Sequence, residues 1–100
     1  MTVAPFDVLA EAHRRGPRFA DPLELWGEAL MRKGDWAGAV ARFAEADQHA
    51  PRWGRNHLRW GEALARLGRT DEARAQWRAA AGMDLSAADR AELARAQRQP

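Results

Sequence analysis

Apolar side chains recur every three or four residues along most of this chain, which is the spacing of an amphipathic helix. One such run follows Asp21 and Pro22, which fit the cap and first turn of a helix, and it ends at Gly34. A second run begins after Asp35, another capping residue, and ends before Pro51. The pattern therefore predicts two antiparallel helices. Their apolar positions are Leu23, Trp26, Leu30 and Met31 in the first, and Trp36, Ala39, Val40, Phe43, Ala46 and Ala50 in the second.

The same pattern returns 34 residues further along the chain. The stretch 26–30 recurs unchanged at 60–64, which marks an internal repeat. The second copy predicts one helix from about Trp53 to Leu67, and another from a cap at Thr70 to about Met83. The further matches are Gly34 with Gly68, Ala39 with Ala73, Phe43 with Trp77, and Ala46 with Ala80.

The repeat register extends beyond these two copies at both ends of the chain. Backwards, the first residues match the second helix of a further copy. Forwards, Ser86 is the predicted cap of a last helix, with Asp89 three residues on as a variant capping box. Leu93 is the one large apolar residue of that helix, which is typical of a terminal cap on a repeat array. The predicted organisation is one all-α domain of about six helices: a half-repeat 1–19, repeats 20–53 and 54–87, and a capping helix 86–99.

This 34-residue unit resembles the tetratricopeptide repeat (TPR). The resemblance rests on a large apolar residue before Gly27 and before Gly61, on Phe43 and Trp77 set between alanines, and on Pro51 at the repeat end. It implies a right-handed α-solenoid whose first helices line a concave groove. The glycines are expected to let helix backbones approach, while the two aromatic residues fill the space between hairpins. By the same resemblance, Trp26, Trp60 and Trp77 are core residues, whereas Trp53 has no assigned role.

The resemblance implies a protein or peptide partner, bound in the groove by an adaptor or scaffold. Two interpretations of the second copy's charges remain open. Its arginines either hold carboxylates of a peptide, or pair with Glu62 along a solvated helix. Some family members clamp a chaperone's C-terminal carboxylate with Lys and Asn, but Glu24, Glu28 and Arg59 stand at the matching positions, which argues against that ligand. The candidate groove residues are Glu24, Glu28, Arg32, Arg55, Arg59, Glu62 and Arg66.

Charge and composition limit the other classes of function. The 16 Lys and Arg residues against 14 Asp and Glu give a formal net charge of +2, which opposes a general polyanion binder. Nucleic-acid binding by the Arg-rich second half is therefore the less favoured alternative. The absence of cysteine excludes disulfides, a thiol catalyst and Cys-based zinc sites. His13, His49 and His57 lack metal-like spacing and are expected at the surface or at helix ends.

No nucleophile–base arrangement or phosphate-binding loop is present in the sequence, so we expect no enzyme, no catalytic residue, no cofactor and no metal. A second functional hypothesis is self-association into a homo-oligomer through the N-terminal edge. There a missing helix would leave Phe6, Val8, Leu9 and Phe19 uncovered. The sequence shows no signal peptide and no membrane span, which favours the cytoplasm.

Overall fold

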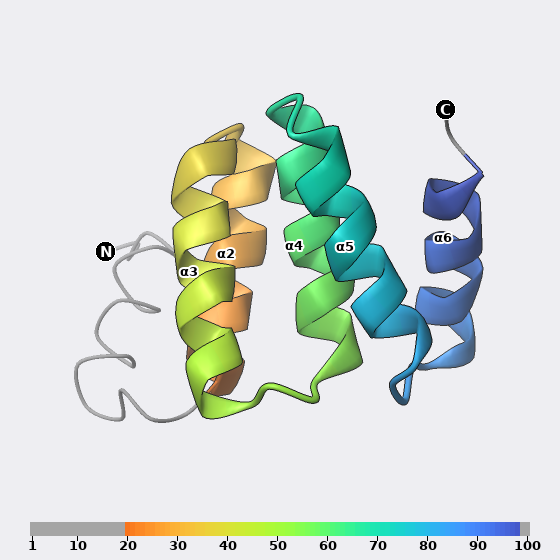
Figure 1. Ribbon diagram of the computed structural model, residues 1–100. Coiled ribbons are helices and arrows are strands. Elements are labelled where there is room, and N and C mark those ends of the chain that lie inside the picture. The colour runs from red at the N-terminus through yellow and green to blue at the C-terminus, as the bar shows by residue number, and fades with distance from the viewer. Residues whose placement is uncertain (1–19, 99–100) are drawn as a thin grey trace.

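The computed structural model describes residues 20–98, and all regular structure in that range is helical. The predicted half-repeat 1–19 lies outside the described residues. The five helices, labelled as in Figure 1, are α2 (Ala20–Lys33), α3 (Trp36–His49), α4 (Gly54–Arg66), α5 (Thr70–Ala81) and α6 (Ala87–Gln97).

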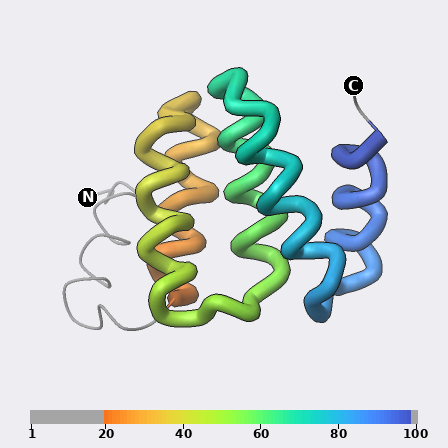
Figure 2. The backbone as a smooth tube through the Cα atoms, in the orientation of Figure 1, coloured from red at the N-terminus to blue at the C-terminus, as the bar shows by residue number. Residues whose placement is uncertain are grey.

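Two helical hairpins stand side by side. The α2–α3 hairpin packs against the α4–α5 hairpin, and α6 follows α5 at the far end (Figure 1). The backbone trace in Figure 2 shows that α2 and α4 form one layer, while α3 and α5 form the layer in front of it. The first helices of the two predicted repeats are therefore neighbours, and α6 contacts both helices of the second hairpin. This arrangement is the all-α solenoid that the repeat predicts.

Glycine closes the first helix of each hairpin. Gly34 and Gly68 have φ angles of +86° and +80°, in the left-handed region that favours glycine. Asp35 then caps α3, because its Oδ1 accepts a hydrogen bond from the amide of Gly38 at 2.9 Å. The predicted cap at Thr70 is wrong. Arg69 occupies the cap position of α5, because the turn has the same backbone conformation as the Asp35 turn one repeat earlier. Its side chain makes no capping hydrogen bond.

Two other predicted helix ends move slightly. α2 already begins at Ala20, so Asp21 lies within its first turn and does not precede the helix. α5 ends at Ala81, two residues before the predicted end, because Gly82 takes the C-cap position. Both shifts are of the size that helix boundaries commonly show.

The core holds one aromatic ring per hairpin, set against a glycine of the facing helix. A Cβ on Gly27 would lie 2.7 Å from Cδ1 of Phe43, and a Cβ on Gly61 would lie 2.5 Å from Cδ1 of Trp77. Both rings are buried. The glycines thus make room for an aromatic side chain of the facing helix, whereas the expectation was close contact between two helix backbones.

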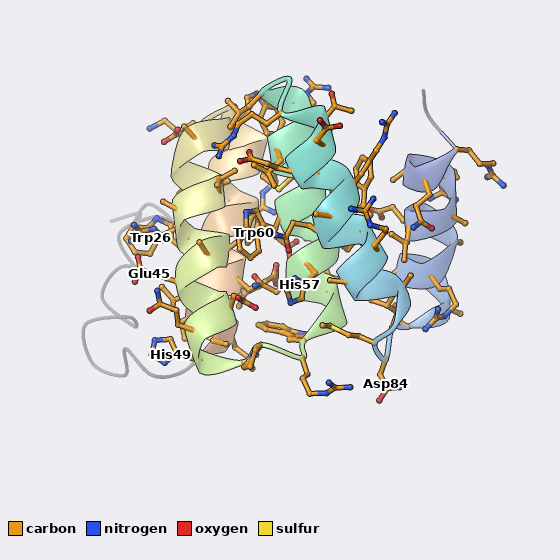
Figure 3. All side chains as sticks on the ribbon, viewed as in Figure 1. Trp26, Glu45, His49, His57, Trp60 and Asp84 are labelled. Atoms are coloured by element: carbon orange, nitrogen blue, oxygen red, sulfur yellow. The ribbon has the colours of Figure 1, made fainter. Side chains whose placement is uncertain are left out.

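The three core tryptophans are not buried alike. Trp77 is buried, whereas Trp26 and Trp60 are half-buried. Trp60 lies between the two hairpins and packs against the buried cluster of Ala39, Phe43 and Ala63 (Figure 3). Trp26, its counterpart one repeat earlier, lies on the side of α2 and α3 that faces away from α4, with the Arg42 guanidinium 4.5 Å from its ring centroid.

His57 lies in the first turn of α4, a helix end as expected, but it is buried and not at the surface. Its Nδ1 lies 2.7 Å from Oε1 of Gln76, and its Nε2 lies 2.9 Å from the carbonyl oxygen of Pro51. Its ring also stacks on Trp60 at 5.9 Å between centroids. The polar ring therefore joins α4, α5 and the connection between the hairpins. His49 is exposed at the end of α3, as expected, and His13 lies outside the described residues.

The start of α4 packs closely against the connection that leads into α6. Trp53, which the sequence left without a role, takes the cap position of α4 in an extended backbone and is half-buried. A Cβ on the next residue, Gly54, would lie 2.7 Å from Cδ2 of Leu85. At the other side of this connection, Ser86 caps α6 as predicted, accepting from the amide of Asp89 at 3.0 Å. Leu93 anchors the helix in the core.

Candidate ligand-binding face

The candidate groove residues lie on α2 and α4, the two first helices, and α6 continues the same face. We call this surface the α2–α4–α6 face. Glu24 and Glu28 extend from α2 towards Arg55 of α4. Arg32 and Arg66 lie in the last turns of their helices, away from this contact. The structure therefore brings five of the seven predicted residues together: Glu24, Glu28, Arg55, Arg59 and Glu62.

Arg55 is held from both sides by carboxylates. Its Nε and one terminal nitrogen donate to the two oxygens of Glu28 at 3.1 and 3.3 Å. Its other terminal nitrogen donates to both oxygens of Asp89 on α6 at 3.1 Å. Glu24 lies 3.7 Å from the same Nε. These bonds hold the pKa of Arg55 above its usual value, so this guanidinium is permanently charged.

Arg59, one turn further along α4, has the same kind of surroundings. It donates to both oxygens of Glu62 at 3.2 and 3.3 Å and makes a short contact with Glu92 of α6. Glu28 and Asp89 lie 3.8 and 3.6 Å away. The Arg59–Glu62 pair is one of the two helical ion pairs expected from the sequence, but its side chains are largely buried and do not lie along a solvated helix. No Glu62–Arg66 ion pair forms within residues 20–98.

The carboxylates around these two arginines form two close pairs. Burial and the neighbouring Glu28 raise the pKa of Glu24 to about 9, while Glu24 and Arg55 lower that of Glu28 despite its burial. Burial and the neighbouring Glu92 likewise raise the pKa of Glu62 to about 8, and hydrogen bonding to Glu62 lowers that of Glu92. In each pair, one carboxyl group therefore keeps its proton to a higher pH than its neighbour does.

This charged cluster ties three helices together. Asp89 is 6% exposed and Glu28 is half-buried, so their charges require a partner within the protein. Arg55 and Arg59 supply it from the central helix, with acids on α2 at one side and on α6 at the other. The two arginines are consequently committed to the chain's own carboxylates. They are not the free cations of a basic half-groove.

Sequence reasoning missed Asp89 and Glu92 as members of the face. Asp89 was interpreted as part of a capping box, and its amide does bond to Ser86. Its carboxylate, however, binds Arg55, which stands 34 residues earlier in the chain, and this separation equals the length of one repeat. Treating the last helix as the first helix of a third copy would have placed Asp89 beside Arg55. The repeat register was therefore the signal that could have found it.

Next to the charged cluster the face is hollowed by a pocket of about 400 Å³. The last turns of α4 and α6 form one side, and Trp36 and Trp77 supply aromatic walls from α3 and α5. Arg66 lies over the Trp36 ring at 4.7 Å from its centroid. We call this hollow the Trp36–Trp77 pocket. It is lined by Met31, Trp36, Glu62, Arg66, Trp77, Glu92, Arg95 and Ala96.

A second hollow, of about 340 Å³, lies on the opposite layer between α3 and α5. We call it the α3–α5 hollow, and its lining includes Val40, Ala44, Trp60 and Ala75. Its charged residues, Arg69 and Glu72, are paired with each other and exposed.

Neither a metal site nor a membrane-spanning helix is found in the part of the chain that the structure describes. Among residues 20–98, no group of three or more His, Asp or Glu side chains is placed to hold a metal ion. None of the described helices is both long and apolar enough to cross a membrane. The apolar edge proposed for self-association, Phe6, Val8, Leu9 and Phe19, lies outside the described residues.

Comparison with known proteins supports the fold. No family model and no curated protein matches the chain. Among solved structures, that of MamA AMB-1, a TPR-containing protein, is similar with a TM-score of 0.73 and 23% sequence identity. The match covers 79% of this chain and 49% of the MamA chain, so this chain spans about half the length of that neighbour. The described helices therefore have a TPR-like helical-repeat fold.

Proposed function

We propose that this chain is a protein–protein interaction module that binds a segment of a partner protein on the α2–α4–α6 face. The observation that carries the proposal is the Trp36–Trp77 pocket, a hollow of about 400 Å³ with aromatic walls and charged groups at its edge. Pockets that bind ligands typically combine an apolar lining with a few polar groups that fix orientation.

Two further features of this face support the proposal. The charged cluster around Arg55 and Arg59 fixes α2, α4 and α6 relative to one another, so the face is preorganised and loses little freedom on binding. Leu25 of α2, one turn before Glu28, is 51% exposed and is the most exposed large apolar side chain of the described residues. An exposed leucine beside a charged cluster suits a partner segment that brings apolar side chains of its own.

The experiment is a selection of random 12-residue peptides on the full chain, followed by affinity measurement with fluorescence anisotropy. Ala96→Leu extends a side chain into the pocket, and we expect it to weaken binding of the selected peptides at least tenfold. Ala91→Leu is the matched control, because Ala91 is exposed on the same helix and does not line the pocket. Circular dichroism checks that both variants keep their helices. Equal affinity of the selected peptides for wild type and Ala96→Leu would refute the proposal.

A further inference from the structure

Each of the three helices of the α2–α4–α6 face carries an arginine in its last turn. Arg32, Arg66 and Arg95 belong to the last turns of α2, α4 and α6, and these three helix ends lie at the same end of the molecule (Figure 1). All three side chains are exposed. Within residues 20–98 none of them makes an ion pair, in contrast to Arg55 and Arg59. They are the cations on this face whose charge is not already balanced by a bonded carboxylate.

The carboxylates of the Trp36–Trp77 pocket do not balance these arginines. Glu62 and Glu92 point towards each other and towards Arg59, which bonds to both. Both carboxylates therefore have their bonded partner in Arg59 and not in Arg66 or Arg95. Arg95 lies one turn from Glu92 and contributes to its low pKa, but no ion pair joins them. Of the charged residues that line the pocket, Glu62 and Glu92 are bonded to Arg59, whereas Arg66 and Arg95 have no bonded carboxylate.

The walls of the same pocket are apolar. Trp36, Trp77, Met31 and Ala96 line it, and its volume of about 400 Å³ lies within the range of about 300–1,000 Å³ that ligand pockets occupy. Such a space accepts one or two large side chains. A ligand complementary to the whole pocket therefore joins an apolar group to a negative charge.

We propose that the Trp36–Trp77 pocket binds an internal segment of the partner protein in which a large apolar side chain is flanked by Asp or Glu, with Arg66 and Arg95 binding the flanking carboxylates. This inference rests on the proposed function and specifies the partner. Two separate cations on two helices, Arg66 on α4 and Arg95 on α6, suit two carboxylates along a chain, whereas a chain terminus brings one. Guanidinium groups are well suited to this role, because they bind carboxylates in a bidentate manner.

The test uses three pools of fluorescein-labelled 12-residue peptides, acetylated and amidated, with a central Leu or Phe. The pools differ only in the two residues on each side of the centre, which are Glu, Gln or Lys. We expect the full chain to bind the Glu pool about tenfold more tightly than the Gln pool, and the Lys pool most weakly. Raising the salt concentration should weaken binding of the Glu pool.

Charge reversal assigns the preference to the pocket. Arg66→Glu with Arg95→Glu should invert the order, so that the Lys pool binds more tightly than the Glu pool. Arg52→Glu is the matched control: Arg52 is exposed, lies outside the pocket, and its reversal should leave the order unchanged. A Gln pool with a free C-terminus should bind no more tightly than the amidated Gln pool.

Four outcomes would overturn the inference: no binding of any pool, tighter wild-type binding of the Lys pool, an unchanged order in the double variant, or tight binding confined to the free C-terminus. If selected peptides still bind in an Ala96→Leu-sensitive way, the proposed function survives any of these outcomes. Only the acidic and apolar character of the partner would then be wrong.

Discussion

Replacing Arg55 by methionine tests whether the charged cluster holds the face together. Methionine keeps much of the aliphatic length of arginine but removes the guanidinium that bonds Glu28 at 3.1 and 3.3 Å and Asp89 at 3.1 Å. Breaking a buried ion pair from one side costs about 3–5 kcal/mol. The Arg55 side chain is 38% exposed, so water screens part of this loss, and we expect about 2–3 kcal/mol. That is a large fraction of the roughly 5–10 kcal/mol that stabilise a small domain.

Urea unfolding, followed by tryptophan fluorescence and far-UV circular dichroism, measures the change in the free energy of unfolding. Arg52→Met is the control and should cost less than about 0.5 kcal/mol, because Arg52 is exposed. Adding Asp89→Asn to Arg55→Met should cost less than the sum of the two single changes, since the second removes a charge that the first leaves unpaired. An Arg55→Met variant as stable as Arg52→Met, or strictly additive losses, would show that the cluster contributes little.

Two further predictions concern the core and the carboxylate pairs. Gly61→Ala places a methyl group against the buried Trp77 ring and should cost about 1–3 kcal/mol of unfolding free energy. Gly82→Ala is the control and should not destabilise the chain, because its Cβ would meet only a carbonyl oxygen at 3.8 Å. Equal urea midpoints for the two variants would contradict the packing of Gly61 against Trp77. Because the folded chain keeps protons on Glu24 and Glu62 that the unfolded chain releases above about pH 4.5, stability should fall as the pH rises from about 5 to about 9. Glu24→Gln with Glu62→Gln should flatten this fall in the urea midpoint. A wild-type midpoint that rises with pH over this range would contradict the raised pKa values of Glu24 and Glu62.

The helices and their pairing were predictable because they depend on local signals. The spacing of apolar residues and the 34-residue repeat require no knowledge of distant contacts, and Gly34 and Gly68 end their helices through their own backbone freedom. The cap of α5 was predicted one residue too late, at Thr70, because threonine is a good capping residue. The 34-residue repeat itself places the cap at Arg69, the counterpart of Asp35. Arg69 aligns with Asp35 and takes the same backbone conformation without the capping oxygen.

The charges on the face could not be assigned from the sequence in the same way. Arg55 stands 27 residues from Glu28 and 34 from Asp89, so its partners depend on how three helices pack. Arg55, Arg59 and Arg66 all lie on α4 as expected, but helix packing gives them different partners. Arg55 and Arg59 are enclosed by carboxylates, whereas Arg66 lies over Trp36 at the pocket. The burial of His57 could not be predicted for the same reason, because its partners Gln76 and the Pro51 carbonyl reach it only in the folded chain.

The most direct test of the proposed binding face is amide chemical-shift mapping by NMR on the full chain, labelled with nitrogen-15 and titrated with a selected peptide. We expect the largest shifts to cluster around the Trp36–Trp77 pocket, at Met31, Arg66 and Arg95. Shifts concentrated instead at the α3–α5 hollow, around Val40 and Ala75, would place the ligand on the opposite layer and contradict it.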